Sequence, residues 1–209
     1  SIYSTYVWRG FGLSDDSIVI QPSMTVGYKG FAMNLWGNLD TDYYAEDTTK
    51  YNETDITLSY DGAYEKLGYG AGYIYYALDG TDDTQEIYGT LSYDVLLSPT
   101  LAFYYDVDDF SGAYYVTFDI SHSFPIGETY TLDLGALVSY MDDNEDYNDF
   151  HNGVLSASMT FPIGNYFSIT PEVNYSFALS SDAEDVIKGG SADDDDSYFY
   201  GGATVSFAF

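Results

Sequence analysis

The chain of 209 residues lacks cysteine altogether and carries very little positive charge. Without cysteine it can form neither a disulfide nor a thiolate metal site. Only 5 basic residues stand against 34 acidic ones, for a formal net charge of −29. This excludes nucleic acid as a partner class, since phosphate binding needs clustered lysine and arginine. A charge this one-sided also strains a compact soluble domain by self-repulsion, unless the acids lie in loops or face water.

Long apolar runs are missing as well. No stretch approaches the roughly 20 residues of a membrane-spanning helix, and no helix-length window has an apolar stripe at helical spacing. The first residues already have a strand pattern, so we expect that any signal peptide of an exported precursor has been removed. What the sequence does contain is alternation of apolar or aromatic residues with small or polar ones. That pattern is typical of β-strands with one dry face.

The alternation predicts about twelve strands in a single domain that spans residues 1–209. The pattern is clearest at the end of the chain, where Phe199, Val205 and Phe207 share one face and Thr204 and Ser206 the other. The expected strands are 2–13, 18–29, 31–41, 53–61, 66–78, 85–97, 100–107, 112–124, 129–141, 151–161, 166–180 and 197–209.

Short turns alternate with long acidic connections along the chain. The short ones include LLSPT and FPIG, which occurs twice, and the long ones include MDDNEDYNDFH and SSDAEDVIKGGSADDDD. This alternation, strands of about ten residues and aromatic strand ends favour an outer-membrane barrel over a water-soluble β-sandwich, the alternative all-β fold. In lipid the sheet must close, because every backbone N–H and C=O needs a partner. We therefore predict a transmembrane antiparallel up-and-down β-barrel with short periplasmic turns, longer acidic extracellular loops and both termini in the periplasm.

The two ends of the sequence resemble known outer-membrane proteins. Val205, Phe207 and Phe209 alternate up to the last residue, and this ending is similar to the signal that the barrel-assembly machinery of Gram-negative bacteria recognises. The opening STYVWRGFGLSDDSIVIQPSMTVGY resembles that of the TorF-like (Gcw_chp) putative porins. The residues that carry this resemblance are Tyr6, Trp8, Arg9, Gly10, Ser14, Gln21 and Pro22. It covers only about the first 30 residues, and it implies a small outer-membrane porin without indicating a substrate.

If the apolar face of each strand contacts lipid, the opposite face lines the lumen. Nearly every central strand then contributes an inward carboxylate: Asp40, Asp55, Glu86, Asp94, Asp106, Asp119, Asp133 and Glu172. We also place Arg9 in the lumen, because a basic residue facing the middle of the bilayer costs about 2–4 kcal/mol. Two interpretations of Arg9 remain open. It either ties several acids into a network that fills the barrel, or it stands beside an electronegative wall that attracts cations.

The lumen pattern predicts a porin-like channel for passive diffusion of small solutes, with a preference for cations. The alternative is a non-conducting structural or adhesive barrel, whose acidic loops bind a surface protein partner or lipopolysaccharide bridged by divalent ions. The expected partners are outer-membrane lipids, lipopolysaccharide and, during biogenesis, the barrel-assembly machinery. The expected location is the bacterial outer membrane.

Other chemistry has weak support in the sequence. Asp142, Asn144 and Asp146 alternate as in an EF-hand, but the glycine and glutamate of that loop are missing, so we predict no metal site and no cofactor. An outer-membrane lipase would need His151, Asn152 and Ser156 together. Alternation directs His151 outward and the other two inward, so we predict that the protein is not an enzyme.

Overall fold

The computed structural model describes residues 1–42, 50–127 and 129–209. The described residues form fifteen strands and one helix. The bounds are β1 Ile2–Tyr3, β2 Val7–Trp8, β3 Phe11–Gly12, β4 Val19–Ile20, β5 Ser23–Tyr28, β6 Phe31–Asp40, β7 Tyr51–Tyr64, β8 Leu67–Leu78, β9 Thr84–Tyr93, β10 Thr100–Asp106, β11 Tyr114–Ile126, β12 Tyr130–Asp142, β13 Asn148–Ile163, β14 Phe167–Ala178, α1 Ser181–Gly190 and β15 Ser197–Phe207.

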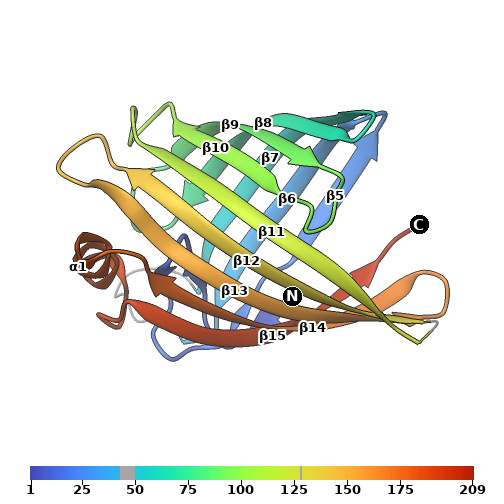
Figure 1. The fold of residues 1–209 in the computed structure, drawn as a ribbon. Helices are drawn as coiled ribbons and strands as arrows, with labels where there is room; N and C mark the ends of the chain where they lie inside the picture. The colour runs from blue at the N-terminus through green and yellow to red at the C-terminus, as the bar shows by residue number, and fades with distance from the viewer. Residues whose placement is uncertain (43–49, 128) are drawn as a thin grey trace.

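The strands close into one antiparallel barrel, as the sequence predicts. Neighbours in the chain pair from β5 through to β15, β15 pairs with β1, β1 with β4, and β4 with β6. Since β4 and β5 both lie along β6, they are two parts of one wall strand, and the described wall has twelve strands. In Figure 1 the barrel lies on its side, with α1 and the longer connections at one end and the tight turns at the other. We call these the loop end and the turn end.

The two faces of the wall differ as the alternation predicts. Large apolar side chains are exposed on the outside of every long strand, among them Met33 on β6, Leu91 on β9, Leu155 on β13 and Val205 on β15. Most of their inward neighbours are small, polar or acidic, and the rest include the aromatic residues Trp36, Tyr76 and Tyr115. A surface of this kind cannot lie in water without a partner, and it matches the lipid-facing band of a transmembrane barrel.

The first two expected strands are interrupted in the structure. Of residues 2–13, only Ile2–Tyr3 belongs to the wall; Val7–Trp8 and Phe11–Gly12 form a separate two-stranded sheet. The prediction of one strand was wrong because a reversal at Arg9 and Gly10 breaks it. Residues 18–29 are split between Ile20 and Ser23, where Pro22 has no N–H to donate to a ladder.

A helix replaces part of the acidic loop that we expected after β14. Ser180 caps α1 by accepting a hydrogen bond from the N–H of Ala183, and Lys188 lies in the last turn, both favourable for helix ends. Ala183 and Ile187, four residues apart, are fully buried against Tyr147 and Tyr198. The helix is thus anchored onto the loop end of the barrel. Among the described residues, no helix is long and apolar enough to cross a membrane.

Candidate functional site

The lumen contains a hairpin formed by residues 4–18, which we call the inner hairpin. β2 and β3 pair through Val7 with Gly12 and Trp8 with Phe11. Arg9 and Gly10 connect them with φ angles of 51° and 94°. Positive φ values at both central positions are typical of the tight turns that suit β-hairpins, and glycine takes such a value at little cost. Local geometry thus places Arg9 at the tip of a turn, and not on a wall strand.

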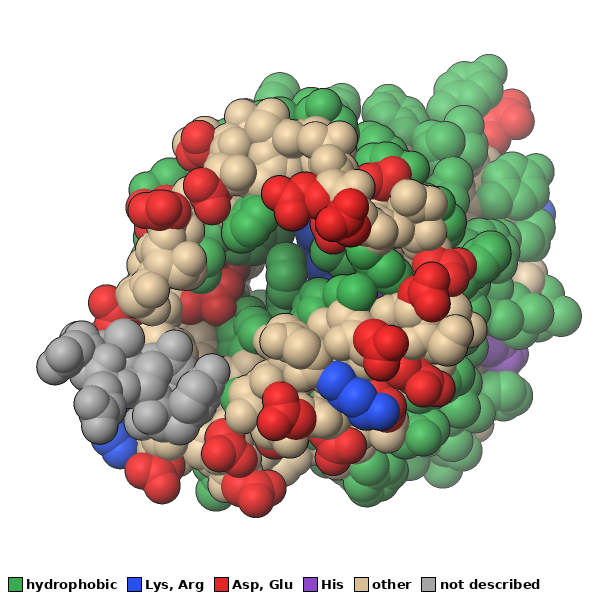
Figure 2. Space-filling model, turned by 90° about the vertical axis from the view of Figure 1, so that its left-hand side faces the viewer, with side chains coloured by type: hydrophobic (Ala, Val, Ile, Leu, Met, Phe, Trp, Pro, Cys, Tyr) green, Lys and Arg blue, Asp and Glu red, His purple; other side chains and the backbone are tan. Residues whose placement is uncertain are grey.

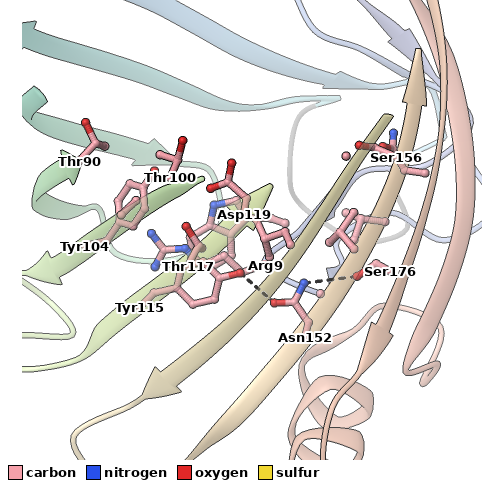
Figure 3. A pocket seen from close by; sticks show the side chains of 18 of the residues that line it. Arg9, Thr90, Thr100, Tyr104, Tyr115, Thr117, Asp119, Asn152, Ser156 and Ser176 are labelled. Atoms are coloured by element: carbon pink, nitrogen blue, oxygen red, sulfur yellow. Dashed lines mark hydrogen bonds between the residues drawn. The ribbon is translucent and has the colours of Figure 1, made fainter. Parts of the chain in front are cut away.

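Carboxylate and aromatic groups surround the Arg9 side chain. Its two terminal nitrogens donate to the two oxygens of Glu86, each at 2.7 Å. Its guanidinium carbon lies 4.5 Å from the ring centroid of Trp8, 4.6 Å from Tyr115 and 5.0 Å from Tyr104. A guanidinium stays protonated in proteins, and Glu86 supplies the opposite charge at 2.7 Å. Arg9 is therefore a permanent cation that Glu86 already neutralises. Figure 3 shows it beside Tyr104 and Tyr115.

His151 holds the backbone of the hairpin tip from the other side. Its Nε2 lies 2.8 Å from the carbonyl oxygen of Arg9, and its Nδ1 lies 2.9 Å from the hydroxyl of Tyr147. Donation to the carbonyl places the proton on Nε2 and leaves Nδ1 to accept from Tyr147. Our expectation that His151 points outward was wrong, since its side chain is fully buried.

A β-bulge explains the inward direction of His151. Val138 pairs with Gly153, but Tyr140 pairs with Phe150, so β13 has one residue more than β12 at this point. Phe150 still points outward, while His151 and Asn152 both lie inside. An extra residue in one strand changes the alternation beyond it, and a pattern read from one strand alone misses this.

A cavity of about 880 Å³ occupies the barrel beneath the inner hairpin. The hairpin contributes Tyr6, Val7, Trp8, Arg9 and Gly10 to its lining. The wall contributes mainly hydroxyl and amide side chains, including Asn34, Thr57, Thr90, Thr100, Thr117, Ser156 and Asn174. This lining offers many hydrogen-bonding groups to a small polar solute, beside apolar side chains such as Ile74 and Val154.

Three of the expected lumen acids lie buried near the loop end. Glu86 contacts Arg9, and its Cα partner across the ladder is Asp106. Asp106 accepts hydrogen bonds from Thr84 and from the backbone of Asp108. The third is Asp40, which accepts hydrogen bonds from Ser17, at the base of the hairpin, and from the backbone of residue 42. These acids are used to hold the wall, the loops and the hairpin together.

Two other expected acids, Asp55 and Asp119, line the cavity itself. Neither forms an ion pair with a described residue, and one oxygen of Asp55 is buried without a hydrogen-bond partner. Asp133 and Glu172 are half-buried on the inner face, where Ser123 and Asn174 donate to them. Asp94 departs from our expectation. The strand ends at Tyr93, so Asp94 lies in the turn that follows and is exposed.

Sequence reasoning missed the aromatic lining around Arg9. Tyr76 donates to Glu86 and packs edge-on against Trp8, while Tyr115 donates to Asn152. Each of these tyrosines is inward by alternation, but their convergence on one point depends on the hairpin. The adjacent Arg and Gly, followed by SDDS, were the only local signal of a turn there.

The remaining sequence hypotheses concern lipase chemistry, metal binding and barrel assembly. Both ring nitrogens of His151 are engaged by Tyr147 and Arg9, so His151 activates no serine among the described residues. The part of the chain that the structure describes contains no cluster of three metal-ligating side chains. Of the expected assembly residues, Val205 and Phe207 are exposed on the outside of β15, and Phe209 extends beyond its end.

A closed antiparallel barrel with an apolar outer belt and a polar interior is the architecture of porin-type outer-membrane proteins. The comparison with solved structures agrees: a NanC porin, solved in a rhombohedral crystal form, matches with a TM-score of 0.61 and 13% identity, over 100% of this chain and 98% of that chain. At this identity the similarity concerns the fold. A scan against protein-family models and a search among curated proteins found no match. The resemblance to TorF-like porins stays a prediction.

Proposed function

We propose that this protein is an outer-membrane porin that lets small solutes diffuse through its lumen and prefers cations. One observation carries the proposal: the cavity inside the barrel is lined by Asp55 and Asp119, and neither carboxyl group forms an ion pair with a described residue. Arg9 is the one basic side chain among the described residues that line the cavity, and it is paired with Glu86. When both carboxyl groups are ionised, a cation entering the cavity gains attraction from them, whereas an anion is repelled.

The charge at the loop end supports the same preference. Figure 2 looks onto this end and shows acidic side chains around a small central opening. Carboxylates arranged around an entrance raise the local concentration of cations and lower that of anions. The effect declines with ionic strength, because the Debye length is about 10 Å at 0.1 M salt. Selectivity should therefore be strongest in dilute salt.

The outer surface supports a location in the outer membrane. Exposed apolar side chains cover the outside of the wall, and the aromatic residues Phe161, Tyr166 and Phe207 lie in or next to the turn between β13 and β14. Lipids of that membrane would cover this belt, and lipopolysaccharide would surround the acidic loops. The alternating Val205, Phe207 and Phe209 suit recognition by the barrel-assembly machinery.

Reversal potentials in a planar lipid bilayer test the proposal. Under a KCl gradient we expect stable unitary currents whose reversal potential indicates cation preference. Asp55→Asn and Asp119→Asn together should reduce that preference. Asp94→Asn, in the exposed turn after β9 and away from both the cavity and the acidic loop end, is the matched control and should leave the preference unchanged. Reproducible insertion without current would overturn the porin and favour a structural or adhesive barrel.

A further inference from the structure

The inner hairpin crosses the full width of the barrel. It leaves the wall after β1, where the N–H of Ser4 donates to Gly201 on β15, and it returns at Ile18, whose carbonyl accepts from Thr41 beyond β6. Around the barrel, β10 lies six strands from β1 in either direction. The tip of the hairpin contacts that opposite wall, because Arg9 stacks on Tyr104 of β10 and binds Glu86 of β9.

Polar contacts fix the tip on one side of the lumen. Arg9 binds Glu86 through its side chain, and its carbonyl accepts from His151 on β13. A Cβ placed on Gly10 would come within 3.1 Å of Asn152, so the backbone packs closely against the wall there. The hairpin tip is thus in contact with the wall at β9, β10, β11 and β13.

Helix α1 covers the loop-side face of the hairpin. The N–H of Gly12 donates to Ser191, and the carbonyl of Gly12 accepts from the N–H of Ala192. Val7 and Phe11 pack against the buried cluster that contains Ile187. These contacts hold the hairpin at a constant depth, between α1 and the cavity.

On the remaining side, the hairpin meets the wall through aromatic rings. Tyr6 lies 5.7 Å from Trp36 on β6, and Trp8 lies 6.2 Å from Tyr76 on β8, measured between ring centroids. Asp55, on the inner face between these strands, lines the cavity at this point. Because the other sides have the Glu86 ion pair, the His151 contact and the segment after α1, a route from the loop end to the cavity is expected at this edge of the hairpin.

We propose that the inner hairpin is the size-limiting constriction of the pore, and that the Arg9–Glu86 pair is the latch that positions it across the lumen. The inference rests on the proposed channel function and deepens it. Arg9 then determines which solutes pass by size, because it fixes the position of the hairpin. Asp55 and Asp119 determine which solutes pass by charge. Small hydrated cations pass the aromatic edge, and larger polar solutes are held back.

Conductance of latch variants tests this inference. Glu86→Gln keeps the shape of the side chain but removes its charge, and Trp8→Ala removes a ring at the edge while keeping both charged partners of the ion pair. In each we expect the unitary conductance to rise at least about twofold, because the narrowest section limits conduction. We also expect larger polyethylene glycols to enter the pore. Lys188→Met is the matched control: it breaks the ion pair of Lys188 with Asp196 on the exposed side of α1 and should change neither quantity.

The possible results distinguish a failure of the constriction inference from a failure of the proposed channel function. If the wild type conducts and neither variant alters conductance or polymer entry, the hairpin is not the constriction, although the protein is a channel. If only the variants conduct, the hairpin is the blocking element and the wild-type barrel is closed. If neither wild type nor variants conduct, the channel function and the inference both fail.

Cysteine labelling gives a second readout if a latch variant folds poorly. The chain has no cysteine of its own, and Ser156 lines the cavity. In a Ser156→Cys background, a bulky impermeant thiol reagent added on the loop side should react faster when Trp8 is alanine. Equal rates with and without that substitution would contradict the constriction.

Discussion

The guanidinium of Arg9 donates a hydrogen bond of 2.7 Å to each oxygen of Glu86, 77 residues further along the chain. The side chains are 11% and 6% exposed, so water does little to replace either partner. Three aromatic rings surround the pair within 5.0 Å of the guanidinium carbon. One arginine thereby joins a strand of the wall to a hairpin inside the barrel.

Breaking this ion pair should destabilise the barrel. We expect Arg9→Leu or Glu86→Leu to lower the free energy of unfolding by about 3–5 kcal/mol, because each leaves an uncompensated buried charge. The double variant should recover much of the loss, since it leaves no unpaired charge. Urea unfolding in detergent micelles measures the free energy of unfolding of the two single variants and the double variant. Single variants within about 0.5 kcal/mol of wild type would mean that the pair is solvated in the membrane.

The two histidines of the chain should respond differently to substitution. His151→Phe removes the contacts with Tyr147 and the Arg9 carbonyl, and we expect a loss of about 1–3 kcal/mol from buried groups left without partners. His122→Phe is the control. His122 is partly exposed beside Phe124 on β11, so its replacement should cost no more than about 0.5 kcal/mol. Thermal unfolding monitored by gel mobility compares them, and equal shifts would refute the inward position of His151.

Alanine substitutions at two turn glycines distinguish the cost of backbone strain from the cost of a steric clash. Gly30 and Gly164 have φ angles of 87° and 68°, so alanine is strained at either position. At Gly30 a Cβ would also lie 2.6 Å from the carbonyl oxygen of Asp61, while at Gly164 nothing lies within 4 Å. We expect Gly30→Ala to slow refolding into lipid vesicles and to destabilise the barrel more than Gly164→Ala. The reverse order would contradict the geometry of the turn between β5 and β6.

Lysine at two adjacent positions of β13 tests the two faces of the wall. Leu155 is exposed on the outside, and Ser156 lines the cavity. Leu155→Lys should cost about 2–4 kcal/mol in lipid vesicles, because it places a charge in the hydrocarbon. Ser156→Lys should fold normally and reduce cation preference in the bilayer. If Leu155→Lys reduced cation preference and Ser156→Lys destabilised the barrel, the inner and outer faces of β13 would be the reverse of those described.

Much of the fold could be predicted from the sequence. The alternation of apolar and polar residues determined the number of wall strands and which side of each faces outward, because a strand changes face at every residue. The unequal connections determined which end carries the loops. Asp55 and Asp119 were placed on the inner face for the same reason. All of these are local properties, so no knowledge of distant partners was needed.

The arrangement of residues inside the lumen depends on contacts between segments that are far apart in the sequence. The turn at Arg9 interrupts a run that alternates like a wall strand, and the bulge at His151 reverses a direction that alternation predicts. Helix α1 forms because Ala183 and Ile187 are buried by Tyr147 and Tyr198, which lie on other segments. The contact of Arg9 with Glu86 exists because barrel closure brings β9 opposite the hairpin. Local alternation specifies the wall strands, whereas long-range packing specifies the inner hairpin and the helix that covers it.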